Sequence, residues 1–185
     1  MIRKRHYIIC ACLWILSFIC IAFIFSNSLQ NGTSSGQTSG TVMNFINSVL
    51  GSISPSLKVD HHFVRKAAHF CEFAALSLSF CFSFWFTFSA TKGVRGKRRF
   101  MTLFSIPASF AVAVCDEVIQ LFIDGRSGSV TDVLIDTSGA VTSALLFFAL
   151  YTLICRLHKK KQTAGCECAC SGVKENDAEK NDAQP

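Results

Sequence analysis

The stretch RKAAHFCEFAALSLSFCFSFWFTFSA, residues 65–90, decides the fold class. From residue 67 onward Glu72 is its only formally charged side chain, and about 20 apolar residues in a helix cross the hydrocarbon core of a bilayer. Phenylalanine recurs at every second position from Phe80 to Phe88, which is the period of a strand. An isolated strand cannot satisfy its backbone hydrogen bonds in lipid, however, so the stretch predicts a membrane-spanning helix.

Three further apolar blocks lie at about 7–25, 100–123 and 133–155, and together with 67–90 they predict four spans. We therefore expect an all-α membrane protein: a four-transmembrane-helix bundle at 7–155, followed by a disordered tail at 156–185. The first block is also similar to a signal peptide, but it is longer than the usual signal core of roughly 7–15 apolar residues. We favour a retained span, and cleavage would leave the other three spans in the same orientation.

The basic residues predict the orientation. Twelve Lys and Arg residues lie near the ends of spans in the segments 3–5, 92–99 and 156–161, whereas four lie in the other two connections, namely Lys58, Arg65, Lys66 and Arg126. Positive residues accumulate on the cytoplasmic side, so we expect both termini and the 91–99 loop in the cytoplasm. We therefore expect a multi-pass protein of the cell membrane with the lipid bilayer as partner. Nucleic-acid binding is disfavoured because the charges are split among three segments.

The long outer connection has two expected parts. Residues 26–41 are rich in Ser, Gly, Asn and Thr, which predicts a flexible linker. Apolar residues then recur at helical spacing, which predicts a short amphipathic helix at about 41–53 on the outer surface, ended by Pro55. In the tail, the run Cys166, Cys168 and Cys170 matches no strong zinc pattern, and an inert reduced tail is favoured over soft-metal binding or acylation.

Polar residues on three spans are predicted to converge. At 100° per residue, one helical face carries Arg65, His69 and Glu72, and a second carries Asp116, Glu117, Gln120 and Asp124. The fourth span presents Asp132, Asp136 and Gly139 on one narrow face. All three sets fall at the outer ends of their spans. They predict an outward-facing pocket with six carboxylates, beside the loop Gly125–Ser129, whose glycines and hydroxyls suit an anion.

Charges inside a membrane are costly and mark functional sites by default. The expected binding residues are Arg65, His69, Glu72, Asp116, Glu117, Gln120, Arg126, Asp132 and Asp136, and the candidates for acid–base catalysis are His69, Glu72, Asp116 and Glu117. No metal site is predicted because the ligand pattern is not definite, although a divalent cation as cofactor on Glu72, Asp116, Glu117 and Asp136 stays open. The alternative, purely structural explanations of these charges are a capping box from Ser129 to Asp132, ion pairs to Arg65 or Arg126, and snorkelling of Arg65 and Lys66.

Several of these segments resemble the motifs of VanZ-like membrane proteins. Arg65–Phe73 resembles the motif R-K-x-x-H-F-x-E-Y/F, and Asp116–Phe122 resembles D-E-x-x-Q-x-F. The loop Gly125–Ser129 and the stretch Asp132–Gly139 follow in the family's order, and Phe25–Ser28 resembles the F-S-S ending of its first span. The resemblance covers about residues 7–155. One departure is Phe73, which stands where a Tyr is common and removes a hydroxyl.

The resemblance implies a bacterial cell-envelope protein, because the founding member of this family is associated with low-level resistance to the glycopeptide antibiotic teicoplanin. It does not supply a mechanism. We therefore expect a protein that binds an anionic ligand, a lipid-linked cell-wall precursor or a glycopeptide in the outward-facing pocket. Two alternatives stay open: a membrane-embedded enzyme acting on a lipid-linked precursor, and a proton-linked transporter. A transporter would require oligomers, because four helices rarely enclose a path.

Overall fold

The computed structural model describes residues 2–53, 58–89 and 102–181, and all its regular elements are helices. They are α1 (Ile2–Ser28), α2 (Gly32–Ile53), α3 (His61–Ser89), the 3₁₀ turn η1 (Thr102–Phe104), α5 (Ser105–Gln120) and α6 (Val130–Asn181). The 91–99 loop and Pro55 lie outside the described residues, as do the side chains of Cys166, Cys168 and Cys170.

Four helical segments are long and apolar enough to cross a membrane: Arg5–Ser28, His61–Ser89, Thr102–Gln120 and Val130–Leu157. The prediction of an all-helical protein with four long apolar helices, each a candidate span, is therefore confirmed for the described residues, and the helix boundaries differ from those expected for the spans. The third helix ends at Gln120 and not at 123, because the chain turns at Leu121 and reaches a left-handed conformation at Gly125, with φ 73°. Asp124, which was expected on that helix, lies instead in this turn with an exposed side chain.

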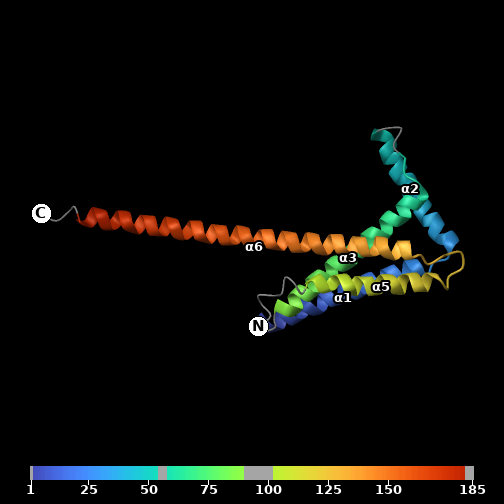
Figure 1. Cartoon of the computed structure of the whole chain (residues 1–185), viewed down its shortest axis with the longest axis horizontal. Helices are drawn as coiled ribbons and strands as arrows, with labels where there is room; N and C mark the ends of the chain where they lie inside the picture. Colours follow the sequence, from blue (N-terminus) through green and yellow to red (C-terminus); the bar gives the residue numbers. More distant parts are fainter. Residues whose placement is uncertain (1, 54–57, 90–101, 182–185) are drawn as a thin grey trace. The chain divides into compact units, whose positions relative to one another are not determined.

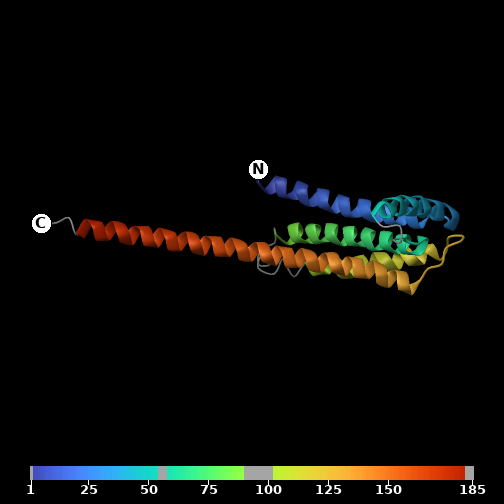
Figure 2. The ribbon, with the colours of Figure 1, turned by 90° about the horizontal axis from the view of Figure 1, so that it is seen from above.

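Within the unit formed by Met1–Phe148, α1, α3, α5 and the first part of α6 run side by side in alternating directions, while α2 lies at an angle to them (Figure 1). Both views show α1, α3 and α5 as neighbours, with the C-terminal ends of α1 and α5 beside the N-terminal ends of α3 and α6 (Figures 1 and 2). At that end two of the connections contact each other, since the backbone N–H of Gly32 donates to the carbonyl of Asp124 at 3.2 Å. One end of the bundle thus gathers the connections that carry the polar motifs.

Helix α2 corrects the expected linker. The sequence predicted a flexible segment at 26–41 and a helix only from about 41, whereas α2 begins at Gly32 and residues 26–28 end α1. The Asn31 side chain accepts the backbone N–H of Ser34 at 3.0 Å and so caps the new helix. The hydroxyls of Thr38 and Ser39 donate back to carbonyls four residues earlier, so these polar side chains satisfy themselves inside the helix.

The apolar core is small and lies between three helices. It consists of Ile24, Phe73, Leu76, Phe80 and Ala113, all buried. Phe80 belongs to the alternating phenylalanines, and within α3 that series is helical, as the argument from backbone hydrogen bonding predicted.

Helix α6 approaches α3 closely through Gly139. A Cβ atom added at Gly139 would clash with the carbonyl oxygen of Phe70, so only glycine permits this spacing. Ala140, whose carbonyl contacts Ser77 of α3, and Ala144 are fully buried. Small residues at such intervals are the usual means by which membrane helices pack closely.

A second feature of the bundle is a group of buried hydroxyls, which we call the serine cluster: Ser17, Ser77, Ser79 and Ser83. The Oγ atom of Ser17 lies 3.0 Å from that of Ser79 and 3.2 Å from that of Ser83. Ser77 donates to the carbonyl of Ala140 at 2.9 Å, which links α3 to α6. Hydrogen bonds of this kind tie membrane helices together.

Helix α6 continues beyond the predicted end of the fourth span at 155 and reaches Asn181. It therefore includes most of the stretch for which the sequence predicts a disordered tail. The segment Ala149–Pro185 forms a separate unit.

Candidate functional site

Three side chains from three helices meet at the end of the bundle where α3 and α6 begin. We call them the acid–histidine cluster: His69 of α3, Asp116 of α5 and Asp136 of α6. One ligand atom of each lies within 4.8 Å of those of the other two, and His69 Nδ1 is 3.6 Å from Asp136 Oδ1. Both aspartates have no exposed surface. The structure thus brings together one member of each predicted polar face.

Four nitrogen and oxygen atoms of these side chains have no hydrogen-bond partner among the described residues. These atoms are His69 Nδ1, Asp116 Oδ1 and both carboxylate oxygens of Asp136. Buried polar atoms are rarely left in this state because each costs free energy. The arrangement is suited to a bound group that lies between the three side chains and contacts these unpartnered atoms.

Gln120 organises the opposite side of Asp116. Its Nε2 donates to Asp116 Oδ2 at 2.9 Å, and its Oε1 accepts from Arg65 at 3.3 Å. Ser28 of α1 lies 3.3 Å from the same Nε2. Gln120 is fully buried, so the amide fixes one carboxylate oxygen and leaves the other pointing away from it.

Glu117 has a structural partner. Its Oε2 accepts the backbone N–H of Ser129 at 2.7 Å, which ties the end of α5 to the start of α6. In the predicted capping box, that N–H would pair with Asp132. Neither bond of the box forms: the Ser129 hydroxyl accepts the N–H of Thr131 at 3.1 Å in place of that of Asp132, and Glu117 takes the place of the Asp132 side chain.

Neither arginine forms the expected ion pair with a carboxylate among the described residues. Arg65 bonds to Gln120, and Arg126 donates to the carbonyl of Asn27 at 2.9 Å. Burial lowers the pKa of Arg126, and Arg65 lowers it further, while Asp116 raises it. A guanidinium stays charged in proteins in any case, so both cations remain available to a ligand.

Glu72 lies beside the acid–histidine cluster but outside the group of three. Its Oε1 accepts from the Asn27 side chain at 3.0 Å. Asn27 and Ser28 were missed as site residues by the sequence reasoning. Their signal was the run Phe25–Ser28 at the C-terminal end of α1, which was used only as a family motif.

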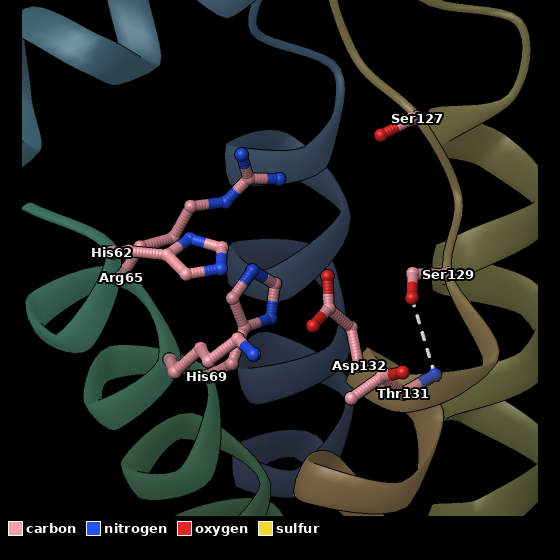
Figure 3. Close-up of a pocket in the computed structure, with 8 residues that line it drawn as sticks. His62, Arg65, His69, Ser127, Ser129, Thr131 and Asp132 are labelled. Carbon is pink, nitrogen blue, oxygen red and sulfur yellow. Dashed lines mark hydrogen bonds between the residues drawn. The ribbon is translucent and has the colours of Figure 1, made fainter.

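Two pockets adjoin the cluster and share Arg65 and His69 in their walls. The first, of about 310 Å³, is polar and is lined by His62, Arg65, Lys66, His69, Ser127, Ser129, Thr131 and Asp132. Figure 3 shows the side chains of His62, Arg65 and His69 on the α3 side, facing Asp132 and Ser129 across the pocket. The second, of about 400 Å³, lies toward α1 and α2 and adds the apolar residues Phe23, Val42, Val64 and Ala68 to Asn27, Glu72 and Arg126.

Comparison with known proteins agrees with the motif resemblance. Neither the curated proteins nor the solved structures include a match to the chain. The family model VanZ/LLP1 matches residues 13–154, a range that contains the four candidate spans except the first residues of α1 and the last residues of the fourth. The chain is a multi-pass membrane protein that belongs to the VanZ/LLP1 family.

Proposed function

We propose that the protein binds a lipid that carries a phosphate, such as a lipid-linked precursor of the cell wall, in the two adjoining pockets at the outer end of the bundle. The observation that carries the proposal is the pair of pockets with Arg65 and His69 in common, one polar and one partly apolar. Such a pair of cavities can accommodate a lipid, with the polar headgroup in one pocket and part of the hydrocarbon chain in the other.

The polar pocket favours an anion by charge. Arg65 and Lys66 each contribute a positive charge against the single negative charge of Asp132. Ser127, Ser129 and Thr131 add hydroxyl groups, and the N-terminus of α6 adds its positive dipole. Arginine pairs well with phosphate because its planar guanidinium can donate two parallel hydrogen bonds.

The orientation in the membrane supports an extracytoplasmic ligand. The positive residues at 3–5, 92–99 and 156–161 favour the cytoplasm for both termini and for the 91–99 loop. With that topology the ends of α1 and α5 and the starts of α3 and α6 lie on the outer side. Lipid-linked wall precursors and glycopeptide antibiotics meet on that side, so binding there would alter the access of a teicoplanin-type antibiotic to its target.

The proposal is tested by binding of a labelled polyprenyl phosphate to the purified full chain, with the uncharged polyprenol as the matched ligand. We expect the phosphate to bind at least roughly tenfold more tightly, since a charge-assisted hydrogen bond is worth about 1.5–3 kcal/mol. Arg65→Gln should remove this preference and Arg65→Lys should restore part of it. Lys58→Gln, which changes an exposed charge outside both pockets, should leave binding unchanged.

Equal binding of the two lipids, or an Arg65→Gln variant that binds the phosphate like wild type, would contradict the proposal. The resistance part is tested separately, by the lowest teicoplanin concentration that inhibits cells expressing the protein. We expect expression to raise that concentration and Arg65→Gln to abolish the increase at the same protein level.

A second candidate function is a membrane-embedded enzyme acting on the same class of lipid. The observation that favours it is the acid–histidine cluster, in which His69 lines both pockets and lies against the buried Asp136. A histidine beside a carboxylate is a common general base. Product formed from the polyprenyl phosphate or a lipid-linked precursor, and lost in His69→Gln, would favour the enzyme. Saturable binding without product favours the binding protein.

A further inference from the structure

The acid–histidine cluster contains more buried acceptor atoms than its surroundings can satisfy. Asp116 and Asp136 have no exposed surface, and three of their four carboxylate oxygens have no hydrogen-bond partner among the described residues. The neighbouring His69 Nδ1, on a side chain that is 13% exposed, has none either. A buried charge persists only when it is paired or coordinates a metal.

The nearby cations do not supply that pairing. Arg65 is bonded to Gln120 and Arg126 to the carbonyl of Asn27, so neither guanidinium reaches the free oxygens of the cluster. A proton on His69 would offset one of the two carboxylates and leave the other. Glu72 lies beside the cluster and is bonded to Asn27, so it adds negative charge to the same region.

We propose that His69, Asp116 and Asp136 bind one divalent transition-metal ion, with His69 Nδ1 and one oxygen of each aspartate as ligands. Two carboxylates and a neutral imidazole balance a charge of two. The donor atoms already lie within 4.8 Å of one another, and His69 Nδ1 and Asp136 Oδ1 are 3.6 Å apart. Ligands at about 2.1 Å from a metal lie roughly 3–3.5 Å from each other, so a small closure completes the site.

The donor set also selects the class of ion. Calcium and magnesium prefer oxygen ligands alone, whereas an imidazole favours first-row transition metals. One nitrogen and two carboxylate oxygens suit Mn²⁺ or Zn²⁺. Gln120 completes the second layer, because its amide holds Asp116 Oδ2 at 2.9 Å and so turns Oδ1 toward the cluster. Partners of this kind orient metal ligands and keep them ionised.

The site would retain an open position. Three protein ligands leave room for water or a ligand on the ion, and His69 also lines both pockets. This inference goes beyond the proposed lipid binding and does not require it. The metal test below uses no lipid and leaves Arg65 intact, so either idea can fail without the other.

The test is titration of the chelator-treated full chain with Mn²⁺, followed by electron paramagnetic resonance of free and bound ion. Cys166, Cys168 and Cys170 are changed to Ser in every sample, so that tail thiolates do not add a site of their own. We expect one tight site per chain. Asp136→Asn and His69→Gln should each weaken it at least about tenfold. Asp124→Asn removes an exposed acid of the turn after α5, outside the cluster and both pockets, and should bind Mn²⁺ like the background chain.

A thermal unfolding series guards against variants that fail to fold. In chelator, Asp136→Asn should be at least as stable as the background chain, because a neutral amide replaces a buried carboxylate of the same shape. Added Mn²⁺ should raise the melting temperature of the background chain and leave that of Asp136→Asn unchanged. If no Mn²⁺ binds, or if Asp136→Asn binds it equally well, the carboxylates hold protons or the ion lies elsewhere, and the proposal is overturned.

Discussion

The serine cluster and the acid–histidine cluster are both buried and polar, yet they treat their polar atoms in opposite ways. In the serine cluster, Ser17, Ser77, Ser79 and Ser83 each donate to a backbone carbonyl. In the acid–histidine cluster, four donor or acceptor atoms have no partner among the described residues. The two groups are separated by little more than two turns of α3, from His69 to Ser77, or about 12 Å.

The difference separates two uses of polarity in a membrane. A hydroxyl that returns its proton to a carbonyl can be buried cheaply, and it brings helices together. A carboxylate with free oxygens is costly, and its presence indicates that another group completes it. The serine cluster is therefore assigned to packing, and the acid–histidine cluster to binding.

The change with the largest expected effect breaks both regions at once. Gly139 lies on α6 one turn after Asp136 and next to Ala140, which accepts from Ser77. In Gly139→Ala the new Cβ would clash with the backbone oxygen of Phe70, so α6 must move away from α3. We expect a loss of about 2 kcal/mol in the free energy of unfolding, measured by denaturation in mixed micelles, together with weaker Mn²⁺ binding.

The matched control is Gly40→Ala in α2, where an added Cβ meets nothing within 4 Å. Because alanine favours a helix over glycine, this variant should be equally stable or more stable by up to about 1 kcal/mol. If Gly139→Ala were as stable as Gly40→Ala, the close contact between α3 and α6 would be disproved. The serine cluster and the acid–histidine cluster would then no longer share one helix contact.

An effect of intermediate size, on unfolding free energy and Mn²⁺ affinity, distinguishes acids that hold the structure from acids that bind the ion. Glu117 belongs to the same predicted polar face as Asp116, but its Oε2 accepts the N–H of Ser129. Glu117→Gln keeps an acceptor and removes the charge, so we expect a loss of about 1 kcal/mol in unfolding free energy and little change in Mn²⁺ affinity. Asp116→Asn should behave in the opposite way, with weak Mn²⁺ binding and unchanged or higher stability in chelator.

Periodicity and hydropathy predicted the helices and the faces that carry the site. His69, Asp116 and Asp136 each lie on a face that the 100° rule selects, and their helices end or begin at the same end of the bundle. The rule could not show which acids bind a ligand, because it contains no distances between helices. Glu72, Glu117 and Asp116 were therefore equal candidates for metal ligands. In the structure Glu72 bonds to Asn27 and Glu117 to Ser129.

Composition was misleading where side chains bond within their own helix. The Ser- and Thr-rich start of α2 was predicted to be a linker because such residues are frequent in loops. In the structure Thr38 and Ser39 bond to the preceding turn, and Asn31 caps the helix. The exchange of Asp132 for Glu117 at the start of α6 could not be predicted either, since it depends on a contact between α5 and α6.

The smallest expected change in unfolding free energy tests most directly whether the two clusters are independent. Ser77→Ala removes the bond to the Ala140 carbonyl, and we expect a loss of about 0.6 kcal/mol, the average for hydrogen bonds between membrane helices. Ser138→Ala is the control, because that exposed hydroxyl donates only to Ile135 of its own helix. Combined with Asp136→Asn, the Ser77→Ala effect should add within about 0.5 kcal/mol. A larger coupling, or altered Mn²⁺ binding in Ser77→Ala alone, would show that the serine cluster takes part in binding and that the two regions act as one.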